Sequence, residues 1–261
     1  LYAAPWARTR RAWTFVESGD GSGIYHSADG GETWTLLTGA DSGFPSGEGA
    51  GRIGLALTAA AGRPILYAAV DNYFRRNKEE PEEEELTKEQ LREMSKADFL
   101  DLKKYLVSDF LRRNGFPSKY DADYVIDRIE DDELTPRDLV VYTEDANSLL
   151  FDTPVKGLEV YRSDDGGQTW ERTHDDYLDG VYNSYGYYFG QIRVAPQDPE
   201  KLYVMGVPIL RSDDGGATWT SINGENVHAD HHALWINPSR PGHLILGNDG
   251  GINISYDDGA T

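Results

Sequence analysis

A nine-residue pattern recurs along this chain and limits what the chain can fold into. "RSDDGGQTW" occupies residues 162–170 and "RSDDGGATW" occupies residues 211–219. "HSADGGETW" lies at residues 26–34, and "SYDDGAT" at residues 255–261 carries the first part of the same pattern. A catalytic motif has no reason to recur several times in one chain. We therefore expect the pattern to have a structural role in all four copies.

The spacing of the copies is typical of a repeated sheet. The last three copies follow one another at intervals of about 40–50 residues, the length of a four-stranded propeller blade. Residues 191–222 are predicted to form four short strands, with a Pro-containing turn after the first and the pattern between the last two. The segments that begin near residues 51 and 233 repeat this order. The predicted fold class is therefore all-β: a β-propeller of four-stranded blades.

Each residue type in the pattern S-x-D-x-G-x-x-W suits a tight turn. The Asp carboxylate can accept backbone N–H groups across the turn, the Gly supplies a positive φ, and the Ser closes the turn locally. The Trp opens the following strand, and we expect its ring to be buried between neighbouring blades. The residues concerned are Ser27, Asp29, Gly31, Trp34, Ser163, Asp165, Gly167, Trp170, Ser212, Asp214, Gly216, Trp219, Ser255, Asp257 and Gly259.

These motifs resemble the Asp box of the BNR-repeat propellers, which include sialidases, glycosidases of the oligoxyloglucan-hydrolase type and sortilin-type receptors. Bacterial sortilin-type, glycosyl hydrolase-like propeller proteins are the most similar group, on "VHADHHALWINPSRPGHLILGNDGG" (227–251) and "DANSLLFDTPVKGLEVYRSDDGGQTW" (145–170). The resemblance covers most of the chain outside residues 75–155. It implies a propeller and a secreted or cell-envelope protein. It does not fix the function, because the group contains both enzymes and binding proteins.

A helical insertion is predicted between the first two copies of the pattern, although the gap is also long enough for further blades. The insertion starts with the acidic run "EEPEEEE", followed by a capping box with Thr87 as N-cap and Gln90 three residues later. Apolar residues at helical spacing predict one helix up to Asn114-Gly115, and two more helices follow. We expect this insertion to cap the loops of the propeller. The predicted domains are propeller blades in 1–74, the acidic helical insertion in 75–155, and propeller blades in 156–261.

Composition excludes several classes of function. The net charge of −20 argues against a nucleic-acid partner, because such binding needs a basic surface. No apolar run reaches the roughly 18 residues of a membrane span, so none is predicted. The absence of Cys excludes disulfides and thiolate metal sites, and no cofactor is predicted. Both ends lie in ordinary domain sequence, so we expect an internal piece of a longer protein with the rest of the propeller outside it.

The two ends of each blade are expected to differ. Antiparallel strands place successive connections alternately at the two ends of a sheet. If the strands are lettered A to D from the axis outwards, the Asp boxes join strands C and D at one end, the Asp-box face. The insertion, the links between blades and the B-to-C turns lie at the other end, the channel face. We expect any ligand site at the channel face, where these loops converge.

Two loops of the channel face carry the candidate ligand-binding residues. "YNSYGYYFG" (182–190) is rich in aromatic rings, which stack on sugar rings or peptide side chains. In "HADHH" (228–232), alternate residues of a strand would share one face and could bind zinc. We expect them instead to line a polar channel, and no metal site is predicted. The candidates are Tyr182, Tyr185, Tyr187, Tyr188, His228, Asp230, His231 and His232.

Asp249 is the candidate catalytic residue. "NDGGINISYDDG" (248–259) resembles the oligoxyloglucan-hydrolase arrangement, in which an acidic residue of a D-x-G-G stretch is a catalytic carboxylate. A glycosidase usually needs a second carboxylate about 5–10 Å away, and the sequence does not identify it. Asp230 or a residue outside the chain are the options. The alternative is that Asp249 only forms a turn.

Three functions are compatible with these features. The favoured one is a non-catalytic, sortilin-type propeller that binds a peptide or protein partner on its channel face. The second is a glycoside hydrolase that acts on a β-glucan-type polysaccharide with Asp249 as a catalytic carboxylate. The third is a subunit of a cell-surface assembly that docks through the helical insertion. The sequence leaves open whether the protein is an enzyme and whether its ligand is a polypeptide or a polysaccharide.

Overall fold

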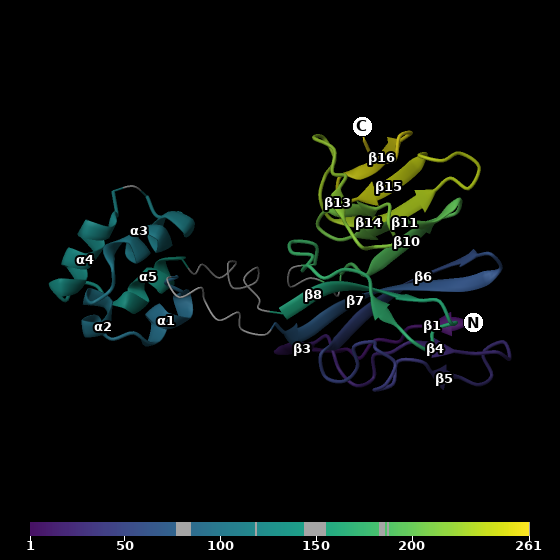
Figure 1. The fold of residues 1–261 in the computed structure, drawn as a ribbon, viewed down its shortest axis with the longest axis horizontal. Coiled ribbons are helices and arrows are strands. Elements are labelled where there is room, and N and C mark those ends of the chain that lie inside the picture. Colours follow the sequence, from purple (N-terminus) through teal and green to yellow (C-terminus); the bar gives the residue numbers. More distant parts are fainter. Residues whose placement is uncertain (77–84, 118, 144–154, 183–185, 187, 261) are drawn as a thin grey trace. The chain divides into compact units, whose positions relative to one another are not determined.

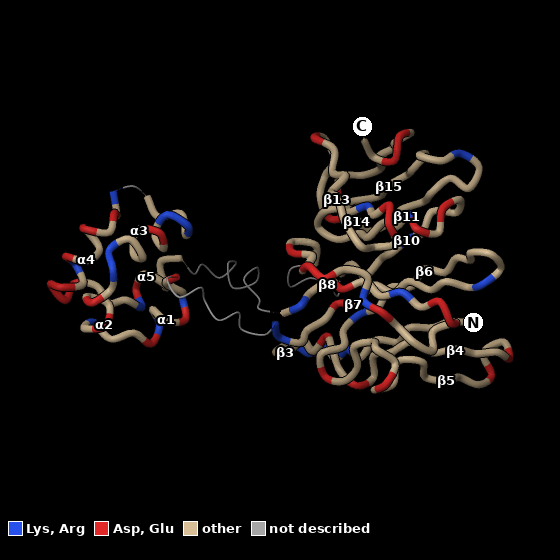
Figure 2. Tube along the Cα trace, in the orientation of Figure 1, with Lys and Arg blue, Asp and Glu red and all other residues tan. Residues whose placement is uncertain are grey.

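The computed structural model describes residues 1–76, 85–117, 119–143, 155–182, 186 and 188–260. The chain forms two compact units, one made of Leu1–Arg76 and Thr153–Thr261 and the other of Asn77–Asp152. The first unit is built of antiparallel β-sheets and the second of short helices (Figure 1). Acidic residues are spread over both units (Figure 2).

Four sheets follow one another along the described part of the first unit, and we call them blades 1 to 4. A separate two-stranded hairpin, β2 (Thr9–Arg11) and β3 (Thr14–Val16), branches from blade 1. The blades are β1 (Tyr2–Ala3), β4 (Tyr25–His26) and β5 (Thr35–Leu36); β6 (Ala50–Ala60), β7 (Arg63–Arg75), β8 (Val155–Ser163) and β9 (Glu171–Arg172); β10 (Gln191–Ala195), β11 (Asp198–Met205), β12 (Ile209–Ser212) and β13 (Thr220–Ser221); and β14 (His231–Ile236), β15 (Leu244–Asn248) and β16 (Gly251–Ser255).

The strand order agrees with the predicted blades. In blades 2 and 3 the four strands are neighbours in chain order, and the Asp box joins the third to the fourth. Strand β7 pairs directly with β8, up to Arg75 opposite Val155, across the whole insertion. The long gap therefore belongs to one blade, and the alternative of further blades within it is wrong.

Apolar cores lie between successive blades, because each blade is a single sheet that can bury a face only against its neighbour. The core between blades 1 and 2 contains Ile24, Leu66 and Trp170. The core between blades 2 and 3 contains Tyr67, Val160, Ile192 and Leu202, and the core between blades 3 and 4 contains Tyr203, Met205, Leu234 and Leu246.

A tyrosine at one repeated position links each blade to the next. Tyr2, Tyr67 and Tyr203 each lie directly opposite the residue that precedes the serine of an Asp box. Each phenol ring lies in or against an inter-blade core, and its hydroxyl donates to the following blade. The acceptors are the Gly166 carbonyl (3.2 Å), the Pro199 carbonyl (3.1 Å) and the Asp258 carboxylate (2.8 Å), in chain order.

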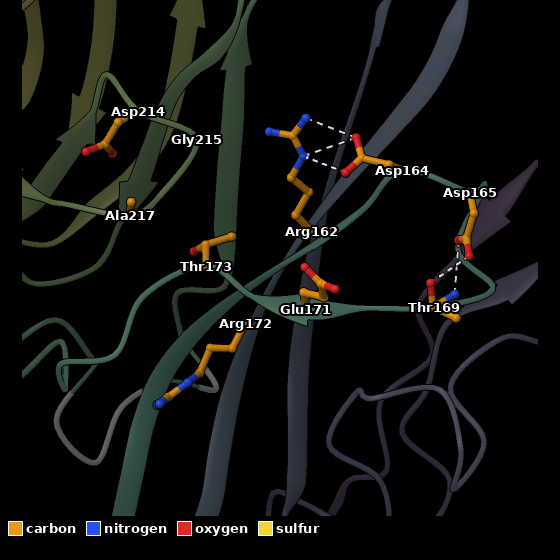
Figure 3. Close-up of a pocket in the computed structure, with 10 residues that line it drawn as sticks. All are labelled: Arg162, Asp164, Asp165, Thr169, Glu171, Arg172, Thr173, Asp214, Gly215 and Ala217. Atoms are coloured by element: carbon orange, nitrogen blue, oxygen red, sulfur yellow. Dashed lines mark hydrogen bonds and ion pairs between the residues drawn. The ribbon is translucent and has the colours of Figure 1, made fainter.

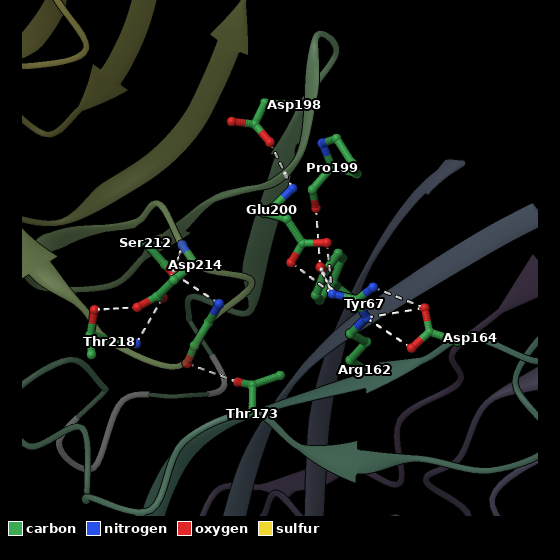
Figure 4. A network of polar contacts seen from close by, with 11 residues as sticks. Tyr67, Arg162, Asp164, Thr173, Asp198, Pro199, Glu200, Ser212, Asp214 and Thr218 are labelled. Carbon is green, nitrogen blue, oxygen red and sulfur yellow. Dashed lines mark hydrogen bonds and ion pairs between the residues drawn. The ribbon is translucent and has the colours of Figure 1, made fainter. Parts of the chain in front are cut away.

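An arginine reinforces this contact in blades 2 and 3. Arg162 donates to the Tyr67 hydroxyl at 3.0 Å and to the Glu200 carboxylate of blade 3 at 2.7 Å (Figure 4). At the equivalent position of blade 3, Arg211 donates to the Asp258 carbonyl of blade 4 at 3.1 Å. The sequence "RS" before a box thus places a guanidinium group where it joins two sheets.

The Asp boxes share one hydrogen-bond pattern. In the box of blade 2, the Ser163 hydroxyl donates to Asp165 at 2.8 Å and accepts the Gly167 N–H at 2.8 Å. The backbone and hydroxyl of Thr169 both donate to the Asp165 carboxylate, at 3.0 and 2.6 Å. The same serine bonds recur at Ser27, Ser212 and Ser255.

The box tryptophans differ in burial. Trp170 is only 3% exposed in the core between blades 1 and 2, where its indole N–H donates to the Gly167 carbonyl at 2.9 Å. Trp219 is half-buried against the core between blades 2 and 3. Trp34 is 42% exposed, contrary to the predicted burial, because no other described sheet packs on that side of blade 1.

The second unit has its own core and contains, among its described residues, helices α1 to α5. The capping box at Thr87 and Gln90 is present. The predicted long helix is wrong: Met94 is extended and Ser95 starts a new helix by accepting the Asp98 N–H at 3.2 Å. The part of the last predicted helix from residue 144 onwards lies outside the described residues. The helices are α1 (Lys88–Glu93), α2 (Lys96–Leu100), α3 (Lys104–Arg113), α4 (Ala122–Glu130) and α5 (Pro136–Thr143).

Neither this unit nor the rest of the described chain contains a helix long and apolar enough to cross a membrane.

The buried side chains of the helical unit come from all five helices and include Leu91, Phe99, Phe110, Ile129 and Leu139. The prediction that this unit caps the propeller loops stays a prediction.

Candidate functional site

Strand β16 shows how the two faces of the propeller unit are related. Its last residue, Ser255, begins an Asp box, whereas Asp249 lies in the turn before its first residue. Five extended residues separate these ends by roughly 16 Å. The links that enter β10 and β14 arrive at the Asp249 end of their sheets. The channel face is therefore distinct from the Asp-box face.

Residues from loops and from the ends of strands β6 and β14 form a continuous row at the channel face. The Arg52 guanidinium carbon lies 6.0 Å from the centre of the Trp6 ring, and Arg52 donates to the Tyr188 carbonyl at 3.3 Å. The rings of Tyr188 and Phe189 each lie 5.5 Å from the ring of His232. We call Trp6, Arg52, Tyr188, Phe189, His232 and Asp249 the channel-face cluster.

The cluster ends in a contact between opposite charges when His232 is protonated. The His232 Nε2 atom lies 3.1 Å from the Asp249 carboxylate, and both side chains are accessible to solvent. Tyr188 is 60% exposed. The row thus contains an exposed tyrosine ring, with the Arg52 guanidinium group on one side of it in the row and the Asp249 carboxylate on the other.

Two glycines allow blades 2 and 3 to approach at this face. Gly190 has a φ of +86° and turns the chain from Phe189 into β10. A Cβ atom at Gly54 would lie 2.2 Å from the Gly190 carbonyl oxygen, and one at Gly190 would lie 3.0 Å from the Arg52 side chain. Side chains at these positions would separate Arg52 from Tyr188.

The β2–β3 hairpin adds positive charge beside the cluster. The guanidinium group of Arg8 lies 5.4 Å from the centre of the Trp6 ring, and that of Arg10 lies 5.5 Å from the Phe15 ring. No ion pair is recorded for Arg8, Arg10 or Arg11 among the described residues, and all three are exposed. In a chain of net charge −20, this hairpin is a local site of attraction for anions.

The structure brings together three of the candidates named from the sequence: Tyr188, His232 and Asp249. Tyr182 lies beneath them, 1% exposed, with its ring stacked on Phe189 at 6.3 Å. Tyr185 and Tyr187 lie outside the described residues.

The remaining candidates of the "HADHH" segment do not share a face. Asp230 has a φ of +65°, and β14 begins only at His231, so the expected alternation along a strand is wrong. His231 is fully buried, and its Nε2 lies 3.2 Å from the Asn223 side-chain oxygen. Burial lowers the pKa of His231 to about 4. His228 is held by its own turn, 2.9 Å from the Ala229 carbonyl.

This geometry gives no support to the zinc arrangement that the segment suggested. Within the described ranges, no group of three or more His, Asp or Glu side chains is placed to hold a metal ion. The left-handed backbone at Asp230 turns its neighbours in different directions, which the sequence pattern does not reveal.

Trp6 and Arg52 were missed by the sequence analysis. The segment "WARTRRAW" (6–13) concentrates tryptophan and arginine in an otherwise acidic chain, and that contrast was a usable signal for Trp6 and its hairpin. Arg52 stands alone in an apolar strand and gives no such signal, because its partners are distant in sequence.

A polar cavity of about 420 Å³ lies on the Asp-box face, between the boxes of blades 2 and 3 (Figure 3). Both Asp-box carboxylates in its lining are already engaged: Asp165 is bound within its own turn, and so is Asp214, by the backbone and hydroxyl of Thr218. Arg162, also in its lining, is bound to Asp164 and Glu200. We therefore place the candidate site at the channel face, where rings and charges remain accessible.

Comparison with known proteins supports the repeat. The family model for the BNR/Asp-box repeat matches residues 25–36 and 161–172. A search of curated protein sequences found no match.

Two solved structures show distant similarity. The crystal structure of the GH74 xyloglucanase from Xanthomonas campestris aligns with 93% of this chain and 27% of its own, at 15% identity and a TM-score of 0.43. The structure of YCF48 bound to D1 peptide aligns with 40% of this chain and 32% of its own, at 19% identity and a TM-score of 0.31. The chain thus spans about a quarter of the xyloglucanase. Similarities this distant carry no inference about ligand or activity.

Proposed function

Because this chain is an Asp-box β-propeller protein, we propose that it is a non-catalytic binding module that holds a segment of a peptide or protein partner on its channel face. The observation that carries this proposal is the channel-face cluster, in which Trp6, Arg52, Tyr188, Phe189, His232 and Asp249 form one row of contacts.

The residue types of the cluster suit a polypeptide. Tryptophan, tyrosine and arginine contribute most to binding energy in protein interfaces, since they offer large rigid surfaces with polar ends. Tyr188 and Trp6 supply such surfaces, and the charges of Arg52 and Asp249, which lie on opposite sides of Tyr188 in the row, can orient a chain. Binding at this face leaves the hydrogen bonds of the Asp boxes untouched.

The hairpin beside the cluster favours a partner with acidic residues. Arg8 and Arg10 are exposed and have no recorded carboxylate partner in the described part of the chain. Guanidinium groups on aromatic rings bind carboxylates with little loss of side-chain freedom, because the rings already hold them in place. We therefore propose an acidic peptide segment as the ligand.

A hydrolase role for Asp249 has less support. The contact recorded for the Asp249 side chain is with His232, and among the described residues no second carboxylate contacts it. The hydrolase hypothesis stays a prediction, tested by incubating the protein with xyloglucan and other β-glucans. Hydrolysis that is lost in Asp249→Asn would overturn the non-catalytic proposal.

The binding proposal is tested with a peptide selected from a displayed random library on the immobilised 261-residue protein. Its affinity is then measured by fluorescence anisotropy. We expect Tyr188→Ala and His232→Ala to weaken binding by roughly 5–30-fold, the loss of a central contact residue. Tyr256→Ala is the matched control, because Tyr256 is similarly exposed but lies in an Asp box. Equal affinities of all variants would refute the proposal.

The proposed charge preference has its own test. Replacing the acidic residues of the selected peptide by their amides, or making Arg8→Ala and Arg10→Ala together, is expected to slow association and flatten its dependence on salt. If the library yields only peptides without acidic residues, the ligand class is wrong although the site can still be correct.

A further inference from the structure

Buried polar atoms without a well-aligned hydrogen bond concentrate at one place in the propeller unit. Among the described residues, the side chains with such an atom are Glu17, Asp71, Tyr73, Tyr182 and His231. All but His231 belong to one group of interacting side chains, which we call the acid–tyrosine cluster. Unsatisfied buried groups are rare in proteins, and several together indicate a missing partner.

The cluster lies where three segments of the chain meet. Asp71 lies in β7, Glu17 follows the last residue of β3, and Tyr182 lies in the link before β10. Asp71 is 2% exposed and Tyr182 is 1% exposed. Tyr73 has its hydroxyl beside both carboxylates, without good hydrogen-bond geometry to either.

The charges in this cluster interact. Burial raises the pKa of Asp71 to about 7, and the nearby charge of Glu17 adds to the shift. Burial also raises the pKa of Glu17 and of Tyr182, and the Asp71 charge raises that of Tyr182 further. The Tyr182 hydroxyl approaches the Gly190 backbone without an aligned bond. The Arg52 charge acts in the opposite direction and lowers the pKa of Tyr182.

Glu159 shows that the same blade can satisfy a buried carboxylate. Glu159 is also 2% exposed, yet it accepts from the Asn72 side chain at 2.6 Å, the Tyr161 hydroxyl at 3.0 Å and Arg172 at 3.2 Å. Asp71 is only one residue from Asn72 and equally buried, yet its Oδ2 atom has no hydrogen-bond partner among the described residues. An unpaired carboxylate in such a position costs several kcal/mol, which a cation would offset.

The backbone closes over Asp71. A Cβ atom at Gly186 would lie 1.9 Å from the Asp71 Oδ2 atom, so only glycine fits there. The close approach of the backbone excludes a large ligand on this side of Asp71.

We propose that the acid–tyrosine cluster is a calcium site, with the carboxylates of Glu17 and Asp71 and the hydroxyls of Tyr73 and Tyr182 as oxygen donors. Oxygen-only donors select hard cations. Calcium fits better than magnesium, because magnesium gives up its water shell reluctantly in a buried site. With two carboxylates the affinity is modest, about 10⁻⁴–10⁻³ M.

The ion would support the channel-face cluster from below. The Trp6 indole donates to the Glu17 carbonyl at 2.5 Å, and the Tyr182 ring stacks on Phe189. Trp6 and Phe189 of the channel-face cluster thus contact residues of the proposed calcium site. The inference is independent of the proposed function, because it concerns the ion and not the ligand.

Terbium luminescence gives a direct test. Terbium can replace calcium in such a site. A bound terbium ion emits light when a tyrosine or tryptophan side chain within a few ångströms of it absorbs light and transfers the energy. The protein, freed of metal with a chelator, should show sensitised emission at one site that added calcium displaces. Asp71→Asn and Tyr182→Phe should reduce the emission at least several-fold, whereas Asp41→Asn, an exposed acid elsewhere, should not.

Calorimetric titration of the unmodified protein with calcium is a second test, which does not depend on whether the variants fold. One site of millimolar or better affinity, with a rise in the unfolding temperature of about 3 °C at saturating calcium, supports the proposal. No calcium binding, or binding unchanged in Asp71→Asn and Tyr182→Phe, overturns it, because the acidic surface rather than the cluster would then account for any uptake.

Discussion

Ser163 shows how one hydroxyl holds an Asp-box turn. It is 2% exposed, donates to Asp165 and accepts the buried N–H of Gly167. We predict that Ser163→Ala lowers the free energy of unfolding by about 1–3 kcal/mol, because the Gly167 N–H loses its acceptor. Urea unfolding measures the change. Ser239→Ala, at an exposed serine, is the control and should cost less than about 0.5 kcal/mol.

His231 makes stability depend on pH. Burial lowers its pKa from 6.5 to about 4, so the unfolded chain binds the proton more readily than the folded one. The stabilising effect is present above about pH 6.5 and is lost as the pH falls towards 4. We predict a loss of the order of 2 kcal/mol over this range that is absent in His231→Gln, which keeps a donor for Asn223.

The measurement is urea unfolding at several pH values for both proteins. Asp230, His228 and His232 also act on His231, but they remain in both proteins, so their effect cancels in the comparison. Identical pH profiles would show that His231 does not titrate as described.

Residue-scale predictions from the sequence succeeded where the interactions are local. The bonds of the Asp box join residues at most four positions apart, so the spacing S-x-D-x-G specifies them. The row from Trp6 through Arg52 to Tyr188 depends on three distant segments, and the sequence pattern identified only Tyr188. The left-handed backbone of Asp230 could not be predicted from the sequence, because it depends on contacts with blade 3.

At the scale of elements, the tyrosines between blades are predicted to act independently. The Tyr67 hydroxyl joins blades 2 and 3, and the Tyr203 hydroxyl joins blades 3 and 4. We predict that Tyr67→Phe and Tyr203→Phe each cost about 1–2 kcal/mol, because each removes the hydrogen bonds of one partly buried hydroxyl. The double variant should equal the sum within about 0.5 kcal/mol, since the two sites share no partner.

Denaturant unfolding of the two single variants and the double variant checks this. A difference larger than about 1 kcal/mol between the double variant and the sum of the single variants would contradict independent contacts. It would show that a change at one blade interface alters the other through the sheet of blade 3.

Strand order was predictable because each blade repeats the same pattern of strands around one box. Helix boundaries were harder to predict. The apolar spacing from Leu91 to Phe110 is continuous, and only the side-chain cap at Ser95 shows that a new helix begins. Such a cap competes with helix continuation, and packing in the helical core decides the outcome.

At the scale of the whole molecule, the helical unit is predicted to be dispensable for folding of the blades. The ends of β7 and β8 are paired at Arg75 and Val155, so a short Gly/Ser linker can replace residues 77–152. We predict that this variant keeps the unfolding transition of the propeller unit within about 3 °C and loses a separate helical transition. Circular dichroism on heating measures both, and an unfolded variant would contradict two separate cores.

The central claim is that the channel face binds and the Asp-box face does not. Hydrogen–deuterium exchange of the 261-residue protein with and without the selected acidic peptide tests it most directly. The account predicts added protection in the segments that contain Arg52, Phe189 and His232, and none in those that contain Asp165 and Asp214. Protection confined to the Asp-box segments would contradict it.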